Sequence, residues 1–164
     1  MPEKPDFNLR NPVHFFALGF GSGLLKPGPG TWGTLAAVPL YWLIAAYLQT
    51  PLEVYLTITG LGFLIGVYLC GKTAQDVGEH DHGAIVWDEI IGFFVTMVAI
   101  APSLTNIVLG FILFRIFDIY KPWPIKVVDQ KVHGGFGIMV DDVIAGIAAC
   151  LILHLLQAPI NTYF

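Results

Sequence analysis

Residues 52–71 read LEVYLTITGLGFLIGVYLCG, and their only charged side chain is Glu53. A helix that crosses the hydrocarbon core of a membrane needs about 20 mainly apolar residues. The run shows neither the period-2 alternation nor the regular turn signals of membrane β-strands. It therefore predicts a membrane helix.

Three more apolar stretches flank this run, at 33–49, at 90–119 with a break at 101–103, and at 143–156. The dipeptides Thr50-Pro51 and Pro102-Ser103 are short breaks that typically join antiparallel neighbours. We expect an all-α, polytopic membrane bundle of about five helices, forming one integral membrane domain over 1–164. The expected segments are an N-terminal segment 1–30 and helices at about 33–49, 52–76, 88–101, 104–119 and 140–157.

The composition agrees with several membrane spans. Hydrophobic residues make up 55% of the chain and charged residues 12%, whereas soluble domains carry about 25% charged residues. The mean hydropathy is +0.71. The start of the chain lacks the features of a signal peptide, so we expect it to be retained. The net charge of −4 argues against a nucleic-acid partner.

The positive charges predict the orientation. If the N-terminus is cytoplasmic, all eight Lys and Arg residues fall on the cytoplasmic side, whereas the loops 49–53 and 101–106 and the tail 157–164 have none. This distribution is the positive-inside pattern. These residues are Lys4, Arg10, Lys26, Lys72, Arg115, Lys121, Lys126 and Lys131.

Carboxylates gather on the same predicted side. Eleven of the twelve, all but Glu53, fall there, and several adjoin apolar runs, where a carboxylate is costly and usually functional. The expected helix 88–101 is about 21 Å long, short for a hydrocarbon core of about 30 Å. We therefore expect its charged end to lie near the lipid headgroups.

A glycine-rich segment, 19–34, ends where a helix is expected to begin. Exposed backbone amides there, with Thr31 or Thr34 as the cap, would form a cradle for phosphate. A flexible turn that needs glycine for tight packing explains the same residues equally well.

Three segments supply acids and bases that suit phosphate chemistry. Asp88 and Glu89 follow His80-Asp81-His82-Gly83, Arg115 and Asp118 share a helix face three residues apart, and Asp141-Asp142 head the last helix. Hard carboxylates favour Mg²⁺ or Mn²⁺ over zinc. Arg115 and Lys121 are candidates to clamp phosphate oxygens. The alternatives are acids that favour a helix N-terminus, an ordinary Arg–Asp pair and an interfacial Lys–Trp anchor.

The blocks 19–34, 80–92, 114–125 and 134–146 resemble the phosphatidylglycerophosphatase A family in order and spacing, and the resemblance covers about 11–156. It implies a bacterial inner-membrane, Mg²⁺-dependent enzyme that hydrolyses phosphatidylglycerophosphate to phosphatidylglycerol and phosphate at the cytoplasmic face. The substrate that the resemblance implies is a phospholipid of the bilayer. The oligomeric state of the protein stays open. By this resemblance the metal and catalytic group consists of Asp88, Glu89, Asp118, Asp141 and Asp142.

Rival functions have weaker support. A membrane phosphotransferase that uses a CDP-lipid would carry an Asp-Gly-X2-Ala-Arg run, which is missing. An ion or metal transporter would place acids near the membrane midplane, whereas here they crowd one surface. The motifs of enzymes that form a phosphoenzyme are also missing, so we expect a metal-activated water to attack phosphorus.

Overall fold

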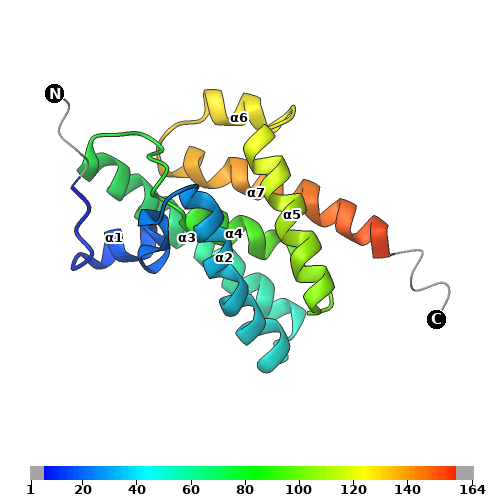
Figure 1. Cartoon of the computed structure of the whole chain (residues 1–164). Helices are drawn as coiled ribbons and strands as arrows, with labels where there is room; N and C mark the ends of the chain where they lie inside the picture. Colours follow the sequence, from blue (N-terminus) through cyan, green and yellow to red (C-terminus); the bar gives the residue numbers. More distant parts are fainter. Residues whose placement is uncertain (1–5, 158–164) are drawn as a thin grey trace.

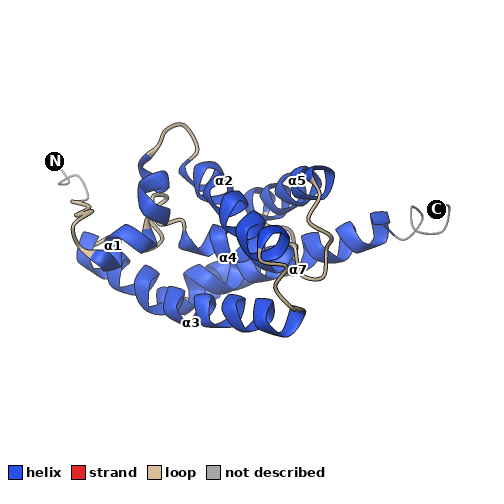
Figure 2. Ribbon diagram, turned by 90° about the horizontal axis from the view of Figure 1, so that it is seen from below, coloured by secondary structure: helices blue, strands red, loops and turns tan. Residues whose placement is uncertain are grey.

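The computed structural model describes residues 6–157, and over this range the chain is helical with no strand (Figures 1 and 2). The expectations for Lys4 and for the tail 158–164 lie outside the described residues. In chain order the elements are α1 Pro12–Ala17, η1 Gly19–Leu24, α2 Pro29–Tyr41, η2 Trp42–Tyr47, α3 Leu52–Val77, α4 Trp87–Thr96, α5 Leu104–Tyr120, α6 Ile125–Lys131 and α7 Gly134–Gln157.

The short helix α4 forms the centre of the bundle. Figure 2 shows α2 and α5 on one side of α4 and α7, with α3 on the other side. Eight of the ten residues of α4 are buried. Its Phe93 and Phe94 pack in the main apolar core with Phe114 of α5 and Ala145 of α7. Packing on all sides explains why a helix this short is stable, since isolated helices of this length are not.

The end of α4 corrects the expected helix 88–101. The helix ends at Thr96, and Ala99 in the following turn has a φ of 55°. The hydroxyl of Tyr55 donates to the Phe94 carbonyl at 2.7 Å, and that of Tyr41 donates to the Ile100 carbonyl at 3.1 Å. Carbonyls at a helix end need such outside partners when they are buried. The two tyrosines therefore stabilise an early helix end.

Other boundaries agree or shift for identifiable reasons. Helix α3 matches the expected 52–76 to within one residue and is closed by Gly78, whose φ is 70°. Helix α7 begins six residues before the expected 140, although glycine disfavours helix. Close packing of α7 on α3 requires a glycine at position 135. A Cβ on Gly135 would lie 1.8 Å from the Val67 carbonyl oxygen of α3.

Two helices within residues 6–157, α3 and α7, are long and apolar enough to cross a membrane. One-third of the tested window in α3 and half of that in α7 are buried inside the molecule. The structure thus confirms an all-helical fold and adds α1 and α6, two short helices that the hydropathy pattern does not predict.

The close approach of α4 and α7 gives a stability prediction. A Cβ on Gly146 would lie 2.4 Å from the Gly92 carbonyl oxygen, whereas one on Gly60 would meet nothing within 4 Å. We expect Gly146→Ala to lower the free energy of unfolding by about 1–3 kcal/mol, as overpacking does. Gly60→Ala, the matched control on α3, should leave stability equal or slightly higher. Thermal unfolding in detergent measures both, and equal melting temperatures would contradict the close packing.

Candidate active site

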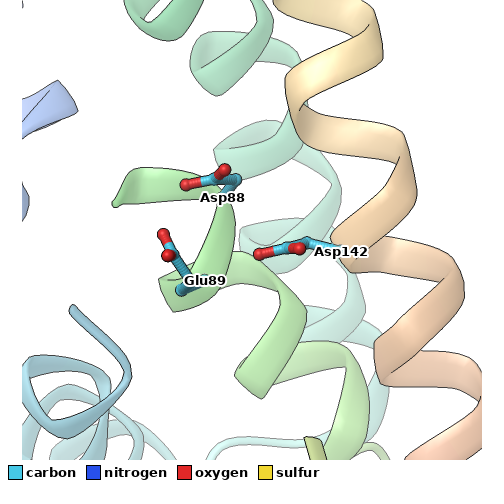
Figure 3. A group of neighbouring side chains, drawn as sticks. All are labelled: Asp88, Glu89 and Asp142. Atoms are coloured by element: carbon cyan, nitrogen blue, oxygen red, sulfur yellow. The ribbon is translucent and has the colours of Figure 1, made fainter. Parts of the chain in front are cut away.

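Three carboxylates from two helices face one another (Figure 3). Asp88 and Glu89 lie in the first turn of α4, and Asp142 lies on α7. One oxygen from each side chain lies within 4.8 Å of the others. All three residues are buried, with exposed fractions of 6%, 9% and 3%. We call them the carboxylate triad.

Local contacts fix the start of α4, which carries two members of the triad. The Val86 N–H donates to the Ala17 carbonyl at 2.9 Å, and the Trp87 indole donates to the Gly62 carbonyl of α3 at 3.0 Å. The close approach of α4 to α7 brings Asp142 alongside. The triad is therefore anchored by elements that surround it, and not by a mobile loop.

Each member of the triad has a buried oxygen without a hydrogen-bond partner in the protein: Asp88 Oδ1, Glu89 Oε2 and Asp142 Oδ2. A buried carboxylate that stays ionised with an unpartnered oxygen is strongly unfavourable unless a cation is near. Oxygen donors are the ligands of Mg²⁺. The donor set and its missing partners therefore fit a divalent cation.

Two basic residues beside the triad are held by carboxylates. Arg115 forms an ion pair with Asp118, and its Nη1 lies 3.8 Å from Glu89 Oε1. Lys121 Nζ lies 2.6 Å from both Asp129 Oδ1 and Asp141 Oδ2. Partial burial works to lower the pKa of Lys121, but these hydrogen bonds outweigh it and raise the pKa, so the side chain stays a cation.

Asp118 and Asp141, expected among the metal ligands, are thus engaged in ion pairs next to the triad. Their role as ligands stays a prediction.

The triad opens into a cavity of about 300 Å³. Its lining holds six carboxylates and two cations, an excess of four formal negative charges if all are ionised. A phosphate monoester adds further negative charge, and two like charges 4 Å apart repel by about 4 kcal/mol at an effective dielectric constant of 20. Such a cavity accepts phosphate only together with additional cations. The charged lining residues are Asp81, Asp88, Glu89, Asp118, Asp141, Asp142, Arg115 and Lys121.

The glycine-rich segment forms one wall of this cavity through Gly28, Pro29 and Gly30. Helix α2 begins at Pro29, four residues before the expected 33, and its cap is Gly28 with a φ of 69°. The prediction that Thr31 or Thr34 caps the helix is therefore wrong. Thr31 is exposed in the first turn, and the buried Thr34 donates to the Gly30 carbonyl at 2.9 Å. Their role in substrate binding stays a prediction.

The structure adds residues that are not among the predicted site residues. Asp129 on α6 completes the pair around Lys121, and Asp81 lines the cavity. The neighbouring histidines bond to the backbone instead: His80 Nε2 accepts from the Gly134 N–H at 2.9 Å, and His82 Nδ1 accepts from the Ala84 N–H at 3.0 Å. Asp129 lies on the short helix α6, and the sequence around it does not indicate that its partner is Lys121.

Gly30 provides a test of how tightly the wall packs on the site. A Cβ at this position would lie 2.2 Å from Glu89 Oε1 and 3.0 Å from both terminal nitrogens of Arg115. We expect Gly30→Ala to lower turnover at least about tenfold, because small misplacements of catalytic groups are costly. Activity and melting temperature should be compared with Gly60→Ala. Unchanged turnover in Gly30→Ala would show that Glu89 and Arg115 do not take part in the reaction.

Fold and site together define the class: an all-helical protein with two candidate membrane helices and a buried carboxylate group suited to a divalent cation. The family model described as Phosphatidylglycerophosphatase A matches residues 15–157. The chain belongs to the phosphatidylglycerophosphatase A family.

Similar proteins cover nearly the whole chain. It is 48% identical over 152 residues to phosphatidylglycerophosphatase A of Escherichia coli, covering 92% of this chain and 87% of that protein. It is 50% identical over 152 residues to phosphatidylglycerophosphatase A of Haemophilus influenzae, covering 92% and 91%. A Bacteroides thetaiotaomicron protein, provisionally named a phosphatidylinositol-3-phosphatase, is 34% identical over 142 residues, covering 82% and 87%. No solved structure matches the chain.

Proposed function

We propose that this protein hydrolyses the terminal phosphate monoester of phosphatidylglycerophosphate, releasing phosphatidylglycerol and inorganic phosphate, with Mg²⁺ held by the carboxylate triad. The observation that carries this proposal is the set of unpartnered buried oxygens on Asp88, Glu89 and Asp142, next to the partly buried Arg115. The two relatives named phosphatidylglycerophosphatase A, at 48% and 50% identity, support the substrate.

Arg115 is the best-placed residue for the phosphate. Its Nε is buried and has no hydrogen-bond partner in the protein, while Nη1 is engaged by Asp118. Arg115 lines the cavity, so a phosphate oxygen there would accept from its guanidinium N–H groups. The first turn of α2 adds the Gly30 N–H, because Pro29 has no N–H and the Thr31 N–H already donates to the Gly28 carbonyl at 3.0 Å.

The side chains of the site then have separate roles in the hydrolysis. Mg²⁺ at the triad would neutralise charge on the phosphate and lower the pKa of a water molecule. Arg115 stabilises negative charge on the phosphoryl oxygens, an electrostatic effect that is large in a site shielded from water. Lys121, a cation at the cavity wall, adds positive charge and holds Asp141 in place. We expect one of the carboxylates to receive the proton of the attacking water.

We further propose that the site faces the cytoplasm at the inner membrane. The stretch α2–η2, α3, the stretch from α4 to the turn before α5, α5 and α7 would form five membrane segments. Helix α4, ten residues and about 15 Å long, reaches only partway through a core of about 30 Å. The charge distribution supports this orientation, because the turns at 49–53 and 101–106 carry no Lys or Arg.

Phosphate release from a short-chain phosphatidylglycerophosphate by detergent-solubilised protein tests the function. We expect release with Mg²⁺ and only background release with EDTA. Short-chain phosphatidylinositol 3-phosphate, offered at equal concentration, should be the poorer substrate. Metal uptake into proteoliposomes without phosphate release would contradict the proposal and support a transporter.

A further inference from the structure

We propose that one acyl chain of the lipid substrate lies in an apolar groove between α2–η2 and α5, which leads away from the carboxylate triad. This inference rests on the proposed function, because it places the tail of the lipid whose phosphate occupies the cavity at the triad. The groove is a second cavity, of about 650 Å³. It is lined by apolar parts of Val38, Trp42 and Leu43 on one side and of Leu104 and Ile107 on the other.

The same two helices form both cavities, at opposite ends. The start of α2 and the end of α5 line the cavity at the triad, whereas the end of α2, η2 and the start of α5 line the groove. Figure 2 shows α2 and α5 on the same side of the molecule, and the sequence colours of Figure 1 show that they run in opposite directions. A polar site and an apolar groove therefore follow one another along one helix pair.

Their separation matches the depth of a lipid tail. From Gly30 to Trp42 the axis of a helix rises about 18 Å, and from Leu104 to Arg115 it rises about 17 Å. One leaflet contributes half of a hydrocarbon core of about 30 Å, which is about 15 Å. A lipid with its terminal phosphate at Arg115 would therefore reach the groove with part of an acyl chain, beyond the glycerol and phosphodiester of its headgroup.

Exposed apolar side chains continue the groove wall toward the triad. Leu35 is 47% exposed and lies four residues before Pro39, which lines the groove, so the two share a face of α2. Val108, also 47% exposed, lies four residues after Leu104 on α5. These side chains leave an apolar path, which suits a hydrocarbon chain and gives a water-soluble phosphate ester nothing to bind.

Substrate chain length gives the kinetic test. Leu43→Trp narrows the groove, and Leu64→Trp makes the same change on the exposed face of α3 as the control. We expect Leu43→Trp to raise the KM for a dipalmitoyl substrate at least about tenfold, because several methylenes lose their apolar contacts. The KM for a dihexanoyl substrate should stay unchanged. Leu64→Trp should resemble the wild type with both substrates.

The outcomes distinguish a failure of the groove assignment from a failure of the proposed function. If the wild type hydrolyses both substrates and Leu43→Trp behaves like Leu64→Trp, the groove assignment is wrong and the function stands. If the wild type hydrolyses neither, the proposed function itself fails.

A second measurement needs no variant. Phosphatidylglycerophosphate with a photoactivatable diazirine near its chain end should label residues within 38–47 and 104–107 of the wild type. Labelling confined to α3 or spread over all exposed helices, or a pair of protein copies cross-linked through this face, would overturn the proposal.

Discussion

Asp88→Asn, Asp118→Asn and Asp142→Asn are each expected to lower kcat at least about 10²-fold, on the scale of losing one electrostatic group in an active site. The three changes keep the side-chain shape and remove one negative charge. Asp88 and Asp142 belong to the carboxylate triad, whereas Asp118 is paired with Arg115. Initial rates of phosphate release at saturating substrate measure the effect.

The Mg²⁺ concentration needed for half-maximal rate separates two roles within this set. Removing a ligand weakens metal binding, so Asp88→Asn and Asp142→Asn should need more Mg²⁺ than the wild type. Asp118→Asn should need the same Mg²⁺ if this residue only positions Arg115. Glu53→Gln, which neutralises the carboxylate at the start of α3, and His82→Ala are the controls and should turn over nearly normally. Near-normal turnover in all three aspartate variants would refute the site.

Arg115→Lys is expected to lower kcat/KM at least about 10²-fold, although the charge is conserved. Arg115 combines an ion pair to Asp118, an approach of 3.8 Å to Glu89 and a free buried Nε. A lysine ammonium cannot reproduce this planar set of donors. Steady-state kinetics with a short-chain substrate measure the change.

Lys126→Arg, an exposed exchange between the same two residue types on α6, is the matched control and should leave kinetics unchanged. Recovery of an Arg115→Ala variant by added guanidinium would add direct support. Wild-type kcat/KM in Arg115→Lys would show that phosphate is not bound through the guanidinium group.

Hydropathy predicts the long helices well and the short ones poorly. The apolar run 52–71 locates α3, because a continuous apolar run of this length indicates a helix whatever the helix packs against. Helix α4 ends early because hydroxyls of Tyr41 and Tyr55, distant in sequence, bind carbonyls near its end. The glycines at the start of α7 predict a loop, yet their contact with α3 stabilises a helix. Both effects depend on residues distant in sequence, so neither can be predicted from a short stretch of the sequence.

The site shows the same limit. The sequence predicts that acids from separate segments converge, since costly carboxylates beside apolar runs point to function, and the structure brings Asp88, Glu89 and Asp142 together. It does not predict that Lys121 lies between Asp129 and Asp141, because that arrangement requires α6 to fold back beside α7. Nor does it predict that Thr34 is buried against its own helix.

Metal binding by the purified protein tests the central claim most directly, because it does not depend on a substrate. Mn²⁺ shares the oxygen ligands of Mg²⁺ and is visible by electron paramagnetic resonance. We predict that the wild type binds Mn²⁺, that Mg²⁺ competes for the same site, and that the double variant Asp88→Asn/Asp142→Asn loses this binding while keeping its helical content. Equal Mn²⁺ affinity in the wild type and the double variant would contradict the account.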